Sequence, residues 1–429
     1  MTDIDARTQP ADPRSAERLH RSGFEYRVVD TADDRATADF LRAETRGFLD
    51  AEPSDDSRDE MAGILRERRN IGVFESSDPL PIATINSWVT PLTVPGGEIP
   101  MWAISSVTVS ATHRRRGIAR QLLEGELRTA AAAGIPIAGL TVSEATIYSR
   151  YGFGSAIPVA QLTIDARRAG WAGPEATGKL AYLEKDELAG VLGELHERAR
   201  TQRAGQIAGW PARWQRMAGL APADKAAADV RGVVWRDEEG RARGAVAYRL
   251  QEIEGEFRAT LQVRHLVADS DEALRGIWSF LVHHDLVNRV SVDLRPVDDP
   301  ITWLVADQRA VTTRIHDHGW LRILDVPAAL QARTYAGTDL EVVLGVTDPL
   351  GFAEGTWRVT ISGGKATVEV TDDAPDVMLD VSSLSSAYVG GVPLTQLAAA
   401  GRVQGERATI SALADALRAP EAPVLSIWY

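Results

Sequence analysis

Cysteine is absent from this chain of 429 residues. Disulfide bonds, zinc sites built on thiolates, iron–sulfur clusters and a cysteine nucleophile are therefore excluded. No run approaches the ~18 consecutive apolar residues of a membrane-spanning helix, and residues 1–22 lack the apolar centre of a signal peptide. The sequence thus predicts a cytoplasmic protein without membrane segments, whose fold depends on packing.

Basic residues are fewer than acidic ones. The chain has 47 Lys and Arg against 60 Asp and Glu, which gives a net charge of −13. A surface with this balance is poorly suited to nucleic acid or to anionic lipid. We therefore expect neither a nucleic-acid nor a membrane partner, and a cationic or amine-bearing partner is favoured.

The length predicts about three domains, because single cores stop growing near ~250–300 residues. Residues 1–22 are polar and contain Pro10 and Pro13, which predicts a flexible N-terminal arm. Strand and helix patterns then alternate, which indicates an α/β (α+β) fold. The boundaries that we expect are an arm over 1–22, a first domain over 23–168, a second over 169–320 and a third over 321–429.

The second domain repeats the order of the first. Residues 104–127 and 261–284 share one order of strand, loop and helix, with different loop chemistry, which predicts a diverged copy of one fold. The pattern also predicts a strand over Phe257–Val267 in the second copy and a hairpin around Ser362–Lys365 in the third domain. The chain ends in an apolar segment, Val424–Trp428, which is expected to be a strand that holds the terminus in place.

The strongest functional signal is a switch from strand to basic loop to helix. The strand Val107–Val109 leads through a short loop into Arg114, Arg115, Arg116 and Gly117, and a helix is expected from Arg114 to Ala133. Unpaired N–H groups at a helix N-terminus bind anions, and arginine side chains add charge-assisted bonds. In a chain of net charge −13, this loop predicts an anion site.

These residues match the Arg/Gln-x-x-Gly-x-Gly/Ala pattern of the GNAT acetyltransferases, which bind the pyrophosphate of acetyl-CoA at this loop. The later segment Ser143–Phe153 resembles the GNAT segment that carries a tyrosine beside the cofactor sulfur. With its duplicated α/β halves and aromatic C-terminal residue, the chain resembles the Enhanced intracellular survival (Eis) family. The resemblance implies tandem GNAT-like domains, the second degenerate, followed by a sterol-carrier-protein-like domain.

The resemblance also implies roles for individual residues in binding acetyl-CoA. Tyr148 would be the general acid that protonates the leaving thiolate. The cofactor-binding residues would be Val107, Thr108 and Val109 along the pantetheine, Arg115, Arg116, Gly117, Ile118, Ala119 and Arg120 at the pyrophosphate, and Ser143 and Glu144 as a further contact.

In the Eis family the free C-terminal carboxylate acts as the base, which here would be the α-carboxylate of Tyr429. An acceptor amine is mostly protonated at pH 7, since a lysine-like amine has a pKa of ~10.4, so a proton acceptor is needed. The resemblance also implies substrate-binding residues. Asp50 matches the position of an acidic pocket residue in the family, and Phe48 lies beside it. Asp317 lies in a loop, Ile315–Trp320, that is similar to another family loop at the pocket.

Two functions from different classes follow. The first is an acetyl-CoA-dependent N-acetyltransferase that acts on aminoglycoside-type or lysine-type amines by direct transfer in a ternary complex, without a metal and, as the resemblance implies, as a homo-hexamer. The second is a lipid-binding or scaffold protein with a vestigial transferase half, because sterol-carrier-like folds can enclose apolar ligands. In the second copy, Ala268–Glu272 carries three acids that would repel a pyrophosphate, so that copy should not bind CoA.

Overall fold

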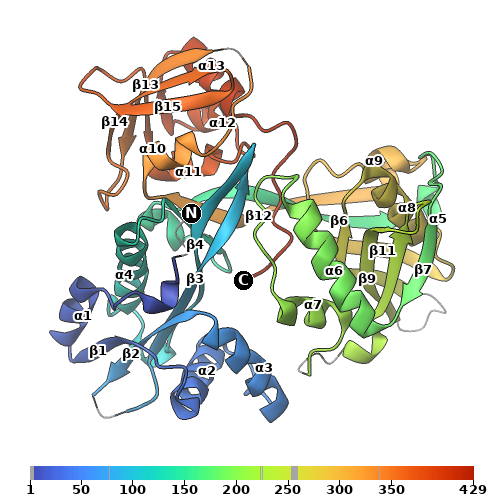
Figure 1. Ribbon diagram of the computed structural model, residues 1–429, viewed down its shortest axis with the longest axis horizontal. Helices are drawn as coiled ribbons and strands as arrows, with labels where there is room; N and C mark the ends of the chain where they lie inside the picture. The colour runs from blue at the N-terminus through green and yellow to red at the C-terminus, as the bar shows by residue number, and fades with distance from the viewer. Residues whose placement is uncertain (1–3, 77, 223, 225, 253–258, 338) are drawn as a thin grey trace. The chain divides into compact units, whose positions relative to one another are not determined.

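The computed structural model describes residues 4–76, 78–222, 224, 226–252, 259–337 and 339–429 (Figure 1). The chain forms two compact units. The first holds residues up to Ala156 together with 319–420 and Tyr429, and the second holds 157–318 and 421–428. Two strands, β6 and β12, run from one unit into the other. No helix among these described residues is long and apolar enough to cross a membrane.

The first unit begins with a sheet in which neighbouring strands are antiparallel except for the parallel pair β4 and β5. Its order is β1-β2-β3-β4-β5-β12. The strands are β1 (Phe24–Val28), β2 (Arg69–Glu75), β3 (Ala83–Val94), β4 (Gly97–Val109), β5 (Ile137–Thr141) and β12 (Val311–Ile323), and the helices are α1 (Pro13–His20), α2 (Asp34–Phe48), α3 (Asp55–Arg66) and α4 (Ile118–Ala132).

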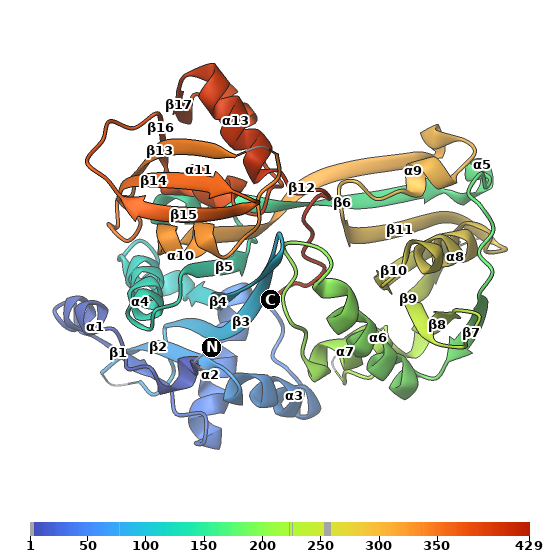
Figure 2. The same cartoon turned by 45° about the horizontal axis from the view of Figure 1, so that its top comes forward.

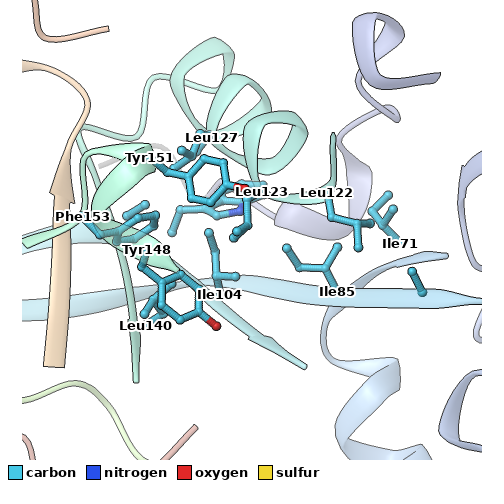
Figure 3. Packing of buried hydrophobic residues seen from close by; sticks show 14 of the residues in the cluster. Ile71, Ile85, Ile104, Leu122, Leu123, Leu127, Leu140, Tyr148, Tyr151 and Phe153 are labelled. Atoms are coloured by element: carbon cyan, nitrogen blue, oxygen red, sulfur yellow. The ribbon is translucent and has the colours of Figure 1, made fainter. Parts of the chain in front are cut away.

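Alternation along the strands divides the core between two sheet faces. In β2, Ile71 packs with Leu122 and Leu123 of α4 in one buried cluster, whereas Phe74 packs with Phe40 of α2 in another. Figure 3 shows the α4 cluster, in which the leucines of the helix meet the isoleucines of the sheet. The helix α4 therefore connects β4 to β5 across one face, and α2 covers the other.

The prediction of a flexible arm over 1–22 is wrong for most of its length. Asp12 accepts a hydrogen bond from Ser15 N at 2.7 Å and caps α1, and Pro13 occupies the first helical turn. Ser15 Oγ donates to Gln121 O at 2.7 Å, and Arg128 pairs with Asp12 at 2.8 Å, which fixes α1 against α4. An Asp-Pro start is a strong helix signal, and it outweighs the polar composition.

The third domain lies in the first unit and contains a five-stranded sheet in the order β15-β14-β13-β16-β17 (Figure 2). The predicted hairpin is confirmed, with Ser362 paired to Lys365 at its turn. The strands are β13 (Leu340–Thr347), β14 (Gly355–Ser362), β15 (Lys365–Val370), β16 (Val377–Asp380) and β17 (Val403–Gly405), and the helices are α10 (Val326–Gln331), α11 (Val381–Ala387), α12 (Leu394–Ala399) and α13 (Arg407–Leu417).

A buried ion pair connects this third domain to the first. Arg322 Nη2 lies 2.6 Å from Asp348 Oδ2, and neither side chain is exposed to solvent. Arg322 Nε also donates to the carbonyl of Tyr151 at 2.8 Å. Burial lowers the pKa of Arg322, and although burial would raise that of Asp348, the neighbouring guanidinium keeps the pKa of Asp348 below its usual value.

Arg322→Met should destabilise the first unit by about 3–5 kcal/mol, because it leaves the Asp348 carboxylate buried without its cation. The matched control is Arg358→Met, which breaks the partly exposed pairs with Glu341 and Asp373 and should change the stability little, because water screens them. Urea unfolding followed by tryptophan fluorescence measures both. Equal midpoints for the two variants would show that the buried pair does not hold the domains together.

The second unit repeats the arrangement around α4. Its sheet has the order β6-β11-β10-β9-β8-β7. The strands β10 and β11 are parallel neighbours, and the helix α8 connects them. The predicted repeat is confirmed; Phe257, the expected start of β10, lies outside the described residues. The elements are β6 (Gly154–Asp165), β7 (Lys179–Leu183), β8 (Arg231–Arg236), β9 (Ala242–Glu252), β10 (Ala259–Ala268), β11 (Val287–Arg295), α5 (Ala166–Ala169), α6 (Lys185–Arg200), α7 (Pro211–Ala218), α8 (Asp271–Val282) and α9 (Ile301–Leu304).

Two local predictions are corrected here. Ile315–Trp320 is part of the strand β12 and is not a loop. Gly319 and Trp320 of this segment already pair with β5. Val424–Trp428 is not a strand. Two of its N–H groups form hydrogen bonds with the segment that follows α6: Val424 N donates to Ala204 O at 2.9 Å, and Ser426 N donates to Gln206 Oε1 at 3.0 Å.

Candidate active site

The site begins where β4 and β5 part. Their parallel pairing covers Met101–Ala103 and Ile137–Gly139, while β4 continues to Val109. From Ile104 onward, the edge of β4 that faces β5 therefore has no pairing with that strand in the described register. An open strand edge can pair with an extended amide chain, which is the chemistry of a pantetheine arm. The predicted cofactor residues Val107, Thr108 and Val109 lie on this edge.

A β-bulge turns the end of β4. The register shifts between Thr84 and Asn86 on β3, and Ser106 opposite has a left-handed φ of 55°. Asn86 Nδ2 donates to Ser106 Oγ at 2.8 Å, and Thr84 Oγ1 donates to the carbonyl of Ser106 at 2.9 Å. These bonds hold a conformation that is costly for a residue with a Cβ, and such bulges often lie beside active sites.

The basic loop ends in an open helix N-terminus. Arg115 and Gly117 both have left-handed φ angles, of 62° and 76°, so α4 starts at Ile118 and not at Arg114 as predicted. No side chain caps its first turn. The N–H groups of Ile118, Ala119 and Arg120 are therefore available to an anion, and the space beside Gly117 is open. This geometry fits a pyrophosphate.

The arginine side chains of the loop differ in what they can offer. The Arg116 guanidinium lies 4.6 Å from the ring centroid of Phe24, which holds it in place. Arg120 Nε donates to Glu124 Oε1 at 2.6 Å, so its charge is already paired. Arg115 is exposed. The backbone N–H groups of the helix start and the exposed Arg115 could therefore both contact an anion, and the predicted roles of Arg115, Arg116 and Arg120 in binding acetyl-CoA stay predictions.

Tyr148 is the first residue of a short 3-10 turn, Tyr148–Tyr151. Its ring meets that of Phe153 edge-on, with centroids 6.1 Å apart, and its hydroxyl points away from Phe153 and Tyr151 (Figure 3). Burial, with a smaller effect of Glu144, raises the pKa of Tyr148, so the phenol keeps its proton at neutral pH. Ser143 and Glu144 are exposed in the loop between β5 and this turn.

The C-terminal residue lies at the end of β5. Thr141 Oγ1 donates to Tyr429 O, and Tyr429 N lies 3.3 Å from the same hydroxyl. The Tyr429 ring meets that of Trp88 edge-on at 5.2 Å. Burial raises the pKa of the Tyr429 phenol. The terminus is thus fixed on the strand that borders the opening beside β4.

Three functional candidates were missed by sequence reasoning. Glu44 Oε1 accepts a hydrogen bond from Ser106 Oγ, and burial, with a smaller effect of Asp50, raises the pKa of Glu44. The Arg68 guanidinium lies 3.8 Å from the ring centroid of Trp88, and burial lowers the pKa of Arg68 to about 10. No local motif marks Glu44, Arg68 or Trp88, since only the tertiary fold brings them to the bulge.

The predicted substrate residues are split between the two units. Phe48 is the last residue of α2, and Asp50 follows the helix. This last turn approaches β4 so closely that a Cβ on Gly47 would lie 2.4 Å from Thr108 Cβ. Phe48 is 45% exposed, so its ring could contact a ligand. Asp317 lies on β12 in the second unit.

The second copy has lost the open helix end. Ser270 caps α8 by accepting from Ala273 N at 3.3 Å. The carboxylate of Asp269, just before the cap, pairs with Arg198 at 2.9 Å and with Arg243 at 2.6 Å. A cap and an internal carboxylate thus occupy the place of the anion site. This supports the interpretation of the copy as degenerate. The described residues contain no group of three or more His, Cys, Asp or Glu placed to hold a metal.

Comparisons with known proteins agree with this arrangement. Models of the acetyltransferase (GNAT) domain match residues 28–156 and 205–323, and a model of the sterol carrier protein domain matches 326–426. An uncharacterised N-acetyltransferase of Streptomyces avermitilis is 34% identical over 89% of this chain and 93% of its own length.

Two mycobacterial proteins are also similar. N-acetyltransferase Eis of Mycobacterium tuberculosis is 32% identical over 78% of this chain and 82% of its own length. The crystal structure of Eis1 from Mycobacterium abscessus superposes with a TM-score of 0.80 at 32% identity, and covers 95% of this chain and all of that one.

Proposed function

The chain belongs to the Eis family of GNAT N-acetyltransferases, and from this premise we propose that it acetylates a primary amine of an aminoglycoside-type or lysine-type substrate directly from acetyl-CoA. The observation that carries the proposal is the parting of β4 and β5 beside an uncapped α4, with Tyr148 and Tyr429 both placed in the same unit.

Acetyl-CoA would supply an acetyl group activated as a thioester. The open edge of β4 would hold its pantetheine arm along Val107–Val109, and the first turn of α4 would hold its pyrophosphate through backbone N–H groups. Arg115, Arg116 and Arg120 would add positive charge around the phosphates. Ser143 and Glu144, on the loop after β5, would line the opposite side.

The reaction needs two proton transfers, and the chain offers a group for each. The Tyr429 carboxylate accepts the proton that the attacking amine loses, and the Val109 N–H polarises the thioester carbonyl. As the carbon–sulfur bond breaks, the Tyr148 hydroxyl donates its proton to the departing thiolate. The acetyl group passes directly between the two substrates in a ternary complex: the bond from the amine nitrogen to the carbonyl carbon forms and the carbon–sulfur bond breaks. The chain has no cysteine that could carry the acetyl group as a thioester in between.

Acidic and aromatic side chains suit an amine substrate. Asp50 and Phe48 at the end of α2 are proposed to face the amine, with Asp317 as a further contact. Glu44 adds a carboxylate next to the bulge. Two carboxylates, Glu44 and Asp50, would attract an ammonium group, and exposed aromatic faces bind cations. The homo-hexamer and the cytoplasmic location belong to this proposal as well.

CoA should raise the melting temperature of the protein by about 5 °C at a concentration near 100 times its Kd, since such binding adds ~2.7 kcal/mol to stability. Arg115→Glu should reduce this shift, because it places a negative charge at the phosphates. Arg167→Glu, which makes the same exchange at an exposed position of α5, serves as the control and should leave it unchanged.

The same assay tests the alternative function. The match to the sterol carrier protein domain makes a lipid-binding or scaffold protein the second candidate. A fatty acid would then raise the melting temperature while CoA would not. That result would overturn the transferase proposal and favour the lipid-binding one.

A further inference from the structure

A groove beside the open helix end is shared by two domains. Its volume is about 520 Å³, and it lies entirely within the first unit. One wall is the start of α4 and its loop, and a second is the end of the Tyr148 turn. The third wall comes from the sterol-carrier-like domain. The lining residues are Arg115, Gly117, Ala119, Arg120, Glu124, Arg150, Tyr151, Pro349 and Leu350.

The third wall is held rigidly in place. Asp348, which pairs with the buried Arg322, also accepts hydrogen bonds from Leu350 N at 3.0 Å and from Ala353 N at 2.8 Å. Leu350 and Phe352 pack against the core cluster of the first domain. Because Arg322 Nε binds the carbonyl of Tyr151, one guanidinium fixes two walls of the groove to each other.

The lining combines an apolar shelf with a basic rim. Pro349 and Leu350 offer apolar surface, and Tyr151 adds an aromatic ring. Arg115 and Arg150 are exposed at the rim, whereas the charge of Arg120 is paired with Glu124. A flat base stacks on apolar or aromatic groups, and phosphate groups pair with arginine. The groove is thus suited to a nucleotide that carries phosphates.

We propose that residues 348–352 of the sterol-carrier-like domain form a shelf for the adenosine end of acetyl-CoA, with Leu350 against the adenine and Arg150 facing a phosphate. The inference rests on the proposed function, because it assumes that the pyrophosphate lies at the start of α4. It gives the third domain a role in the affinity for acetyl-CoA, in addition to that of the loop at the start of α4.

Truncation of the cofactor tests the shelf. Leu350→Asp should raise the KM for acetyl-CoA about tenfold or more, which corresponds to ~1.4 kcal/mol, because it removes the apolar contact with the adenine and repels the phosphate on the ribose of the adenosine end. It should leave unchanged the KM for acetyl-4′-phosphopantetheine, which lacks adenosine. Val370→Asp, an exposed apolar-to-acid exchange on β15 of the same domain, is the matched control and should change neither value.

The possible outcomes separate the two proposals. If wild-type protein binds CoA and Leu350→Asp raises both KM values equally, or neither, the shelf is wrong and the proposed function stands. If wild-type protein neither binds CoA nor uses either thioester, the proposed function itself fails. If Leu350→Asp lowers the melting temperature without ligand, Pro349→Glu, at an exposed position, replaces it. It should likewise raise the KM for acetyl-CoA and leave the KM for acetyl-4′-phosphopantetheine unchanged.

Discussion

Extending the chain by two glycine residues beyond Tyr429 should reduce acetyl transfer about 100-fold or more, because general base catalysis contributes ~10²–10⁴-fold. The extension converts the terminal carboxylate into an amide, which cannot accept the proton of the amine. The new carboxylate would lie two residues away from Thr141, whose hydroxyl binds Tyr429. Turnover under saturating acetyl-CoA measures the effect.

The structure supplies a control that separates the carboxylate from the ring. Tyr429→Phe keeps the terminal carboxylate and the edge-on packing against Trp88, and removes only the phenol. Since burial raises the pKa of that phenol, it is neutral and is not expected to act as the base. Tyr429→Phe should therefore keep most of the activity.

The extended chain should also keep its fold and its cofactor site. Val424 and Ser426 anchor the preceding segment through Ala204 and Gln206, so two added glycines do not remove its contacts. The melting temperature and the CoA-induced shift should thus match those of the wild type. If the extended chain keeps full turnover, the Tyr429 carboxylate is not the general base. Glu44, the carboxylate beside the bulge, would then be the next candidate.

The cofactor loop was predictable because its signal is local. Arg114–Gly117 follows a strand and opens a helix, and each of these features can be identified from neighbouring residues. The first residue of α4 was not predictable, because nothing in the residue type of Arg115 indicates that its φ angle is left-handed. The repeat was predictable for the same reason as the loop, since it depends on the order of local patterns.

The acceptor side was less predictable because tertiary contacts create it. Ser106 adopts a left-handed φ only because Asn86, Thr84 and Glu44 bind it from β3 and α2. Neither Glu44 nor Arg68 carries a motif, and their pKa shifts arise from burial that the sequence does not encode locally. The role of the third domain in the groove likewise depends on a long-range ion pair, Arg322–Asp348.

Tyr148→Phe should lower turnover about 100-fold or more while the KM for acetyl-CoA changes less than about threefold. The substitution removes only the proton donor, and the ring keeps its packing against Phe153. A loss in kcat without a loss in KM indicates an interaction made in the transition state. Because burial raises the pKa of Tyr148, the wild-type acid stays protonated through neutral pH, and its deprotonation should not limit the rate there.

Tyr151→Phe is the matched control for this prediction. Tyr151 lies in the same 3-10 turn, is as deeply buried as Tyr148 and also carries a phenol. Because Tyr151→Phe keeps the aromatic ring that lines the groove, the loss of the hydroxyl should leave turnover at saturating acetyl-CoA near the wild-type value. An aryl thioester, whose thiolate leaves without a proton, should restore much of the rate of Tyr148→Phe. Equal losses in both variants, or no recovery with the aryl thioester, would show that Tyr148 supports the fold of the turn and does not act as the acid.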